Sequence, residues 1–158
     1  RLYFEVAYFG FTSQNYKLSL RFIQYIINDS TGVGKVFNSF AKLLFIVIHY
    51  ELKNETVVKR QLKFFSENIL LYNGGVHKLI LNFIEADIRN EFKLPERRRQ
   101  LDFLKVEIEK AIKSDPSIEI LAEEYFNVYS WLKSKVERIS FASVIRQKVI
   151  EEYGKSPF

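Results

Sequence analysis

The sequence predicts an all-α fold of about eight helices that pair as antiparallel hairpins. Apolar residues recur at helical spacing along most of the chain, and short turn signals rich in Gly, Asn, Asp and Pro separate the segments. The hydrophobic fraction of 47% is ample for a core in a chain of 158 residues. Helices in series with short connections have two packing solutions, a compact bundle or a right-handed stack of helix pairs.

The first half of the chain contains four predicted helices. They cover residues 2–13, residues 16–28, about residues 35–52, and a segment that follows the N-cap Asn54 and ends at Asn73-Gly74-Gly75. Apolar residues surround the third helix almost completely, which is typical of a helix buried between its neighbours. Its Ile46-Val47-Ile48 run also suits a strand, but the series Phe37, Phe40, Leu44 and Val47 keeps helical spacing, so we expect a helix.

The second half contains the other four predicted helices. They cover residues 76–90, a segment from Pro95 to Ser114, a segment from Pro116 to about Val136, and residues 140–153. The segment after Pro95 carries one clean apolar stripe, made of Leu101, Leu104, Ile108 and Ile112. Asp115 is expected to cap the helix that Pro116 begins, and Gly154 is expected to end the last one.

Residues 1–29 show the spacing of a known helical repeat. A large residue, Tyr3, is followed four residues later by the small Ala7, and another small residue, Ser19, lies twelve residues further on. This pair of helices therefore resembles a tetratricopeptide (TPR) unit, in which small residues let the two helices approach closely. The pair departs from the TPR pattern at Gly10, where an aromatic residue is usual, and at Thr31, where a Pro is expected.

The rest of the chain matches this pattern more loosely. Residues 36–72 form a degenerate second pair, and residues 76–153 form further hairpins without a recognisable repeat. Residues 26–52 and 125–135 are similar to uncharacterised TPR-like proteins of Bacteroidetes-type bacteria, in which the matching region lies near the C-terminus. The resemblance implies one helical-repeat domain over residues 1–158, stacked as a right-handed α-α superhelix, with no catalytic residues carried over. Because the chain begins at Arg1 in what reads as mid-helix, we expect a fragment of a longer bacterial protein.

The residue types needed for catalysis and cofactor binding are scarce. The absence of Cys excludes disulfides, thiolate zinc sites and cysteine catalysis. His49 and Glu51 are two residues apart and do not share a helical face, so no metal-ligand pattern forms. The segment 29–36 lacks the first Gly of a phosphate-binding loop and has Val36 where that motif needs Ser or Thr. We therefore expect no enzyme, no cofactor and no metal.

Carboxylates and aromatic residues leave this expectation unchanged. The acidic residues Glu85, Asp87, Glu123 and Glu124 have no matched partner at a spacing that would compel acid–base chemistry. The densest aromatic cluster contains Tyr125, Phe126, Tyr129 and Trp131. Aromatic residues at helical spacing usually pack inward, so we expect this cluster in the core, with an interface as the alternative.

Charge is distributed unevenly along the chain. The net charge is +5, and residues 17–63 contain eight Lys and Arg against three Asp and Glu. The run Arg97-Arg98-Arg99 fans around a helix, so we expect a solvated face with an intrahelical pair such as Arg98–Asp102. The longest apolar run, Leu43 to Ile48, is far shorter than the roughly 20 residues that span a bilayer, so we expect no membrane span and a cytoplasmic location.

Two functions follow as hypotheses. The first is a non-enzymatic protein–protein interaction scaffold that binds a peptide or partner helix on a concave face. Its candidate residues are Tyr8, Thr12, Lys42, His49 and Glu85. The alternative is a nucleic-acid-binding helical repeat that uses the basic 17–63 region. Its candidate residues are Lys17, Arg21, Lys59 and Arg60.

Overall fold

A computed structural model describes residues 1–28, 35–66, 75–115 and 126–154. Within these residues the protein has eight α-helices and no strand, which confirms the predicted all-α class. The helices are α1 (Leu2–Thr12), α2 (Tyr16–Asn28), α3 (Lys35–Glu51), α4 (Glu55–Ser66), α5 (Val76–Asn90), α6 (Leu94–Ser114), α8 (Val128–Glu137) and α9 (Phe141–Tyr153).

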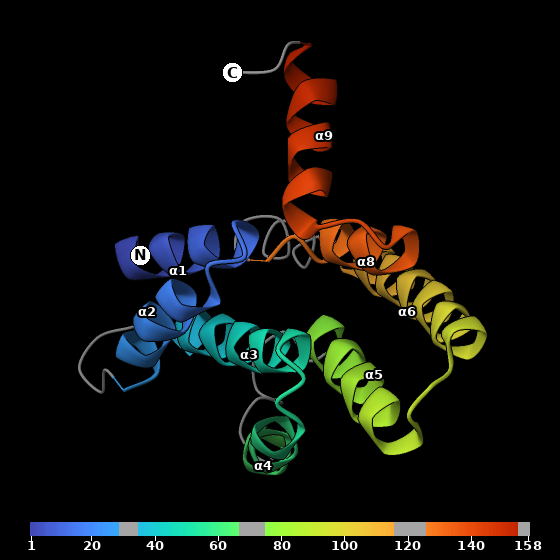
Figure 1. The fold of residues 1–158 in the computed structure, drawn as a ribbon, viewed down its shortest axis with the longest axis horizontal. Helices are drawn as coiled ribbons and strands as arrows, with labels where there is room; N and C mark the ends of the chain where they lie inside the picture. Colours follow the sequence, from blue (N-terminus) through green and yellow to red (C-terminus); the bar gives the residue numbers. More distant parts are fainter. Residues whose placement is uncertain (29–34, 67–74, 116–125, 155–158) are drawn as a thin grey trace.

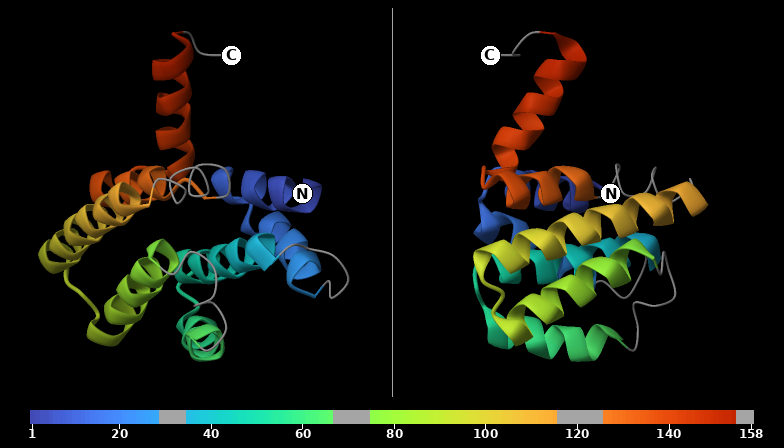
Figure 2. Two further views of the ribbon diagram at one scale, coloured as in Figure 1. Left: turned by 180° about the vertical axis from the view of Figure 1, so that it is seen from behind. Right: turned by 90° about the vertical axis from the view of Figure 1, so that its right-hand side faces the viewer.

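The helices are arranged around α3 (Figure 1). Helices α2 and α4 pack on different sides of α3, while α5, α6 and α8 continue the curve and bring the chain back beside α1. The largest interhelical contacts join helices that follow one another in the chain, as hairpins require. Figure 2 shows from two further directions that α9 projects away from the other helices. The right-handed TPR-like superhelix stays a prediction.

Helix α3 forms the centre of the core. Leu43, Leu44, Ile46, Val47 and Ile48 are all fully buried, because other helices surround α3. The β-branched run at residues 46–48 is helical, as expected from the spacing of the surrounding apolar residues.

The sequence pattern of α1 does not predict which side of the helix is buried. Its buried residues include Phe4, Ala7 and Phe11, whereas Leu2 and Phe9 are 68% and 65% exposed. Because α1 is apolar on nearly every side, periodicity identifies the helix but not its orientation. The positions of α2, α3 and α9, all of which contact α1, decide which side is covered.

The predicted close approach of the first two helices occurs at small residues. The Ser19 hydroxyl donates a hydrogen bond to the Ala7 carbonyl oxygen at 2.6 Å, and both residues are fully buried. At Gly10, an added Cβ would lie 2.8 Å from the Ser19 backbone nitrogen. The glycine that departs from the TPR pattern is therefore required by the distance between α1 and α2.

The predicted boundaries of α5, α6 and α9 are confirmed. Helix α5 covers residues 76–90, and α6 has Pro95 in its first turn. The predicted α6 stripe is buried at Leu101, Leu104, Ile108 and Ile112. Ser140 caps α9 by accepting a hydrogen bond from the Ser143 backbone N–H, and Gly154 ends the helix with a φ of 67°.

The prediction of one continuous helix from Pro116 to Val136 is wrong. The backbone of Asn127 is not helical, and its side chain accepts a hydrogen bond from the Ser130 N–H at 2.9 Å, so α8 begins as a new helix at Val128. Phe126, immediately before this cap, is buried against Phe11. Core packing and the polar cap thus override the helical spacing. Residues 116–125 and the phosphate-loop candidate at 29–34 lie outside the described residues.

Aromatic packing joins the beginning of the described chain to its end. The Phe11 ring lies 5.2 Å from the Phe141 ring and 5.9 Å from the Phe126 ring. The Tyr8 ring packs edge-on against Phe141, and its hydroxyl oxygen accepts a hydrogen bond from the Asn127 N–H at 3.2 Å. These contacts hold α1 against the two residues that precede α8 and against the beginning of α9.

His77 is a buried neutral group in the α3–α5 contact. Its Nδ1 lies 3.2 Å from the Ser39 hydroxyl oxygen, and its ring packs edge-on against Phe40. Its Nε2 is buried without a hydrogen-bond partner among the described residues. Burial lowers the pKa of His77 to about 4, so the folded protein keeps this imidazole neutral.

This burial predicts a loss of stability in mild acid. Between pH 6.5 and about 4 the unfolded chain protonates His77 while the folded protein does not, so the free energy of unfolding falls as pH decreases through that window. The full loss is at most about 3 kcal/mol. Urea unfolding across this window should show a weaker pH dependence in His77→Leu. Equal slopes in both proteins between pH 6.5 and about 5, above most carboxylate pKa values, would contradict the prediction.

Candidate functional site

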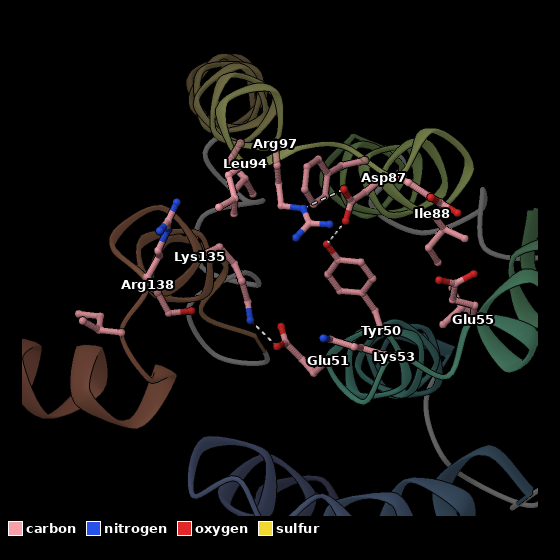
Figure 3. Close-up of a pocket in the computed structure, with 16 residues that line it drawn as sticks. Tyr50, Glu51, Lys53, Glu55, Asp87, Ile88, Leu94, Arg97, Lys135 and Arg138 are labelled. Atoms are coloured by element: carbon pink, nitrogen blue, oxygen red, sulfur yellow. Dashed lines mark hydrogen bonds and ion pairs between the residues drawn. The ribbon is translucent and has the colours of Figure 1, made fainter.

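A pocket of about 620 Å³ lies among the ends of several helices (Figure 3). The C-terminal ends of α3, α5 and α8 and the first turns of α4 and α6 line it. We call it the central pocket. Its apolar lining residues are Val58, Phe83, Ile88, Leu94, Leu101 and Ile139.

Asp87 anchors a polar network on one side of the central pocket. This side chain is only 3% exposed, yet it carries a carboxylate. Its Oδ2 accepts a hydrogen bond from the Tyr50 hydroxyl at 2.5 Å, and its Oδ1 accepts one from Arg97 Nε at 2.9 Å. Burial, followed by the hydrogen bond to Asp87, raises the pKa of Tyr50 far above its ordinary value, so Tyr50 remains a donor. The network joins α3, α5 and α6.

Glu51 anchors a second network on the opposite side. Its Oε1 accepts a hydrogen bond from the buried Trp131 indole N–H at 2.9 Å, and its Oε2 accepts one from Lys135 Nζ. Both donors lie on α8, so Glu51 joins α3 to α8 across the pocket. Trp131 and Phe126 are each 1% exposed, which confirms the core position predicted for these two aromatic residues.

The charges that line the pocket are balanced in number. The basic residues are Lys53, Arg97, Lys135 and Arg138, and the acidic residues are Glu51, Glu55, Asp87 and Glu91. Figure 3 shows the guanidinium group of Arg97 beside Asp87, pointing into the pocket. Nowhere in the described ranges do three or more His, Asp or Glu side chains gather in a way that could hold a metal ion.

The five residues predicted from sequence for partner binding do not line the central pocket. On α1, Tyr8 contacts Phe141 and Asn127 as described above, and the Thr12 hydroxyl donates to the Phe9 carbonyl oxygen. On α3, Lys42 is half-buried.

His49 lies on α3 and Glu85 lies on α5. The His49 ring contacts Phe45, and its Nδ1 lies 3.1 Å from the Asn54 amide nitrogen. Glu85 is exposed on α5 and pairs with Arg89 at 2.7 Å. The five predicted residues thus lie on α1, α3 and α5, and none of them belongs to the lining of the central pocket.

The basic residues of the 17–63 region are also divided. Lys17 and Arg21 lie on α2, whereas Lys59 and Arg60 lie on α4, and α3 runs between these two helices (Figure 1). Lys59 pairs with Glu55 at 3.2 Å. The predicted basic stretch is therefore not one continuous helix face.

Sequence reasoning missed the contact between Arg97 and the buried Asp87. The solvated face predicted for Arg97-Arg98-Arg99 is present at Arg98 and Arg99, which are exposed, whereas the Arg97 side chain is 42% exposed and its Nε binds the buried Asp87. The suggested Arg98–Asp102 pair is not among the ion pairs of the described residues. One signal was present: Asp87 lies seven residues after Ile80 and four after Phe83, which places a carboxylate on the buried stripe of α5.

Comparison with known proteins identifies no relative. No protein-family model matches the sequence, and neither a curated protein nor a solved structure shows significant similarity to it. None of the helices in the described residues combines the length and apolar character needed to cross a membrane.

Proposed function

We propose that this protein is a non-enzymatic scaffold that binds a peptide or a partner helix in the central pocket. The observation that carries the proposal is an open, partly apolar pocket in which four charged side chains are already held in position. Asp87 and Arg97 bind one another, and Glu51 binds Trp131 and Lys135. Because these side chains are ordered before a ligand arrives, binding costs less conformational entropy.

The chemistry of the lining supports a binding role over a catalytic one. All four carboxylate oxygens of Asp87 and Glu51 accept hydrogen bonds from the protein. Both carboxylates therefore already serve contacts within the protein, as expected for the pre-ordered lining of a binding site. The apolar lining supplies contact area, and the surrounding charges fix orientation, which is the usual division of roles in a ligand pocket.

Filling the central pocket is expected to abolish peptide binding. Panning the full chain against a random-peptide display library should enrich peptides that bind the unmodified protein. Ile88→Trp places an indole among the lining residues, so the enriched peptides should bind this variant at least about tenfold more weakly, a difference of about 1.4 kcal/mol.

Ile150→Trp is the matched control. Ile150 is exposed on α9 and does not line the central pocket, so this variant should bind like the unmodified protein. Thermal unfolding of both variants checks that they fold. Equal peptide affinity in the two Trp variants would argue against the central pocket, and failure to enrich any peptide would argue against the scaffold function.

A further inference from the structure

Three arginines that have no ion pair with any described residue border the central pocket. An open surface pocket of about 670 Å³ lies next to it, lined by Leu94, Pro95, Arg98, Arg99 and Arg138, and we call these five residues the arginine rim. Leu94 and Arg138 line both pockets, so the two are adjacent. The arginine rim combines the first turn of α6 with the C-terminal end of α8.

The cations of the arginine rim have no internal counter-ion. Within the described residues, Arg98, Arg99 and Arg138 form no ion pair or side-chain hydrogen bond, unlike Arg97 and Lys135 next to them. All three are exposed, and Arg138 is held in a left-handed conformation with a φ of 57°, at the C-cap of α8. Their donors are therefore available to an external anion.

An apolar side chain lies among these charges. Leu94, which belongs to the arginine rim and also lines the central pocket, is 56% exposed. An exposed leucine bordered by guanidinium groups suits a ligand that offers both carboxylates and an apolar side chain. Arginine binds carboxylates, and phosphates as well, through two parallel hydrogen bonds.

We propose that the ligand of the central pocket is an acidic peptide segment with interspersed aliphatic residues, and that the arginine rim binds its carboxylates. This inference rests on the proposed scaffold function and specifies its ligand. The aliphatic side chains of the ligand contact Leu94 and enter the central pocket, while Arg98, Arg99 and Arg138 bind the acidic ones.

The surroundings favour an acidic peptide over nucleic acid. Single-stranded nucleic acids bind through successive aromatic platforms along a basic groove. Here the arginine rim contains no aromatic residue. The exposed Phe103 ring lies beside Arg99 in a neighbouring pocket, but one ring does not form a series of platforms. The exposed carboxylates Glu91, Glu96 and Glu137 would repel a continuous phosphate backbone. A peptide can place separate carboxylates between them.

Two labelled synthetic peptides test the proposal. One alternates glutamate with leucine, and the other alternates lysine with leucine. Fluorescence anisotropy with the full chain should detect binding of the glutamate peptide, at least about tenfold tighter than the lysine peptide, and this affinity should fall with added salt. If both peptides bind equally well and Ile88→Trp abolishes both interactions, the scaffold function stands and the acidic specificity is overturned.

Charge reversal at the arginine rim locates the interaction. Arg98→Glu/Arg138→Glu should lower the affinity for the glutamate peptide at least about tenfold, whereas Arg146→Glu, on the exposed side of α9, should not change it. Because the two rim arginines are exposed and unpaired, the double variant should keep the unmodified melting temperature. Equal losses in the rim variant and in Arg146→Glu would overturn the proposal. So would tighter binding of a labelled oligothymidylate than of the glutamate peptide.

Discussion

Replacing Gly10 with alanine is expected to destabilise the protein by about 2 kcal/mol. In an ordinary helix interior the same change stabilises by about 1 kcal/mol, because alanine has the higher helix propensity. Here the new methyl group would lie 2.8 Å from the Ser19 nitrogen and 3.1 Å from the Asn15 carbonyl oxygen, so two backbones would have to separate. Urea unfolding followed by the fluorescence of Trp131, the single tryptophan, measures the change.

Gly75→Ala provides the matched control. Gly75 precedes α5 with a φ of −75°, and an added Cβ would lie at an ordinary 3.6 Å from the Ala111 side chain. This variant should therefore be neutral within about 0.5 kcal/mol. A stabilised Gly10→Ala protein would mean that α1 and α2 do not approach one another as closely as the structure has them.

Replacing Asp87 with alanine is expected to destabilise the protein by roughly 2–3 kcal/mol. The change removes the acceptor for the Tyr50 hydroxyl, which is largely buried, and the charge partner of Arg97. It also leaves space where a buried side chain joined three helices. Equilibrium unfolding in urea measures the loss, and Tyr50→Phe tests its origin. When Tyr50 is already phenylalanine, Asp87→Ala should cost less, because no hydroxyl is left unpaired.

Glu85→Ala is the control for this prediction. Glu85 lies two residues before Asp87 on the same helix and also pairs with an arginine, but it is exposed at the surface of α5. Exposed pairs of this kind contribute little, so the loss should stay below about 0.5 kcal/mol. Similar costs for Asp87→Ala and Glu85→Ala would contradict the role assigned to the Asp87 network.

Helix positions could be predicted from sequence because their signals are local. Pro95, Ser140 and Gly154 mark helix ends through their own backbone preferences and caps, and the predicted boundaries follow them. The prediction failed at Asn127, where the same local signal, a capping residue, was present within an apolar pattern that continues through it. The burial of Phe126 against Phe11 decided in favour of a new helix start after Asn127 over a continuous helix.

The candidate site was beyond prediction because its contacts join distant parts of the chain. Glu51 meets Trp131 and Lys135 across 80 and 84 residues, and Tyr50 meets Asp87 across 37. Whether a helix turns a given side chain toward its neighbour depends on how the two helices pack, which periodicity alone does not specify. For this reason the sequence did not indicate that Arg97 binds the buried Asp87.

The sequence by itself determined the all-α class, most helix boundaries, the buried course of α3 and the small residues between α1 and α2. Each of these depends on residues that lie within one hairpin. Only the tertiary structure decided which side of α1 is buried, which carboxylates are paired, and that α6 and α8 bring Arg98, Arg99 and Arg138 together. These features depend on how helices from different hairpins rotate and pack. Burial of apolar surface is non-directional, so it fixes that arrangement while the polar residues that come together are a consequence of it.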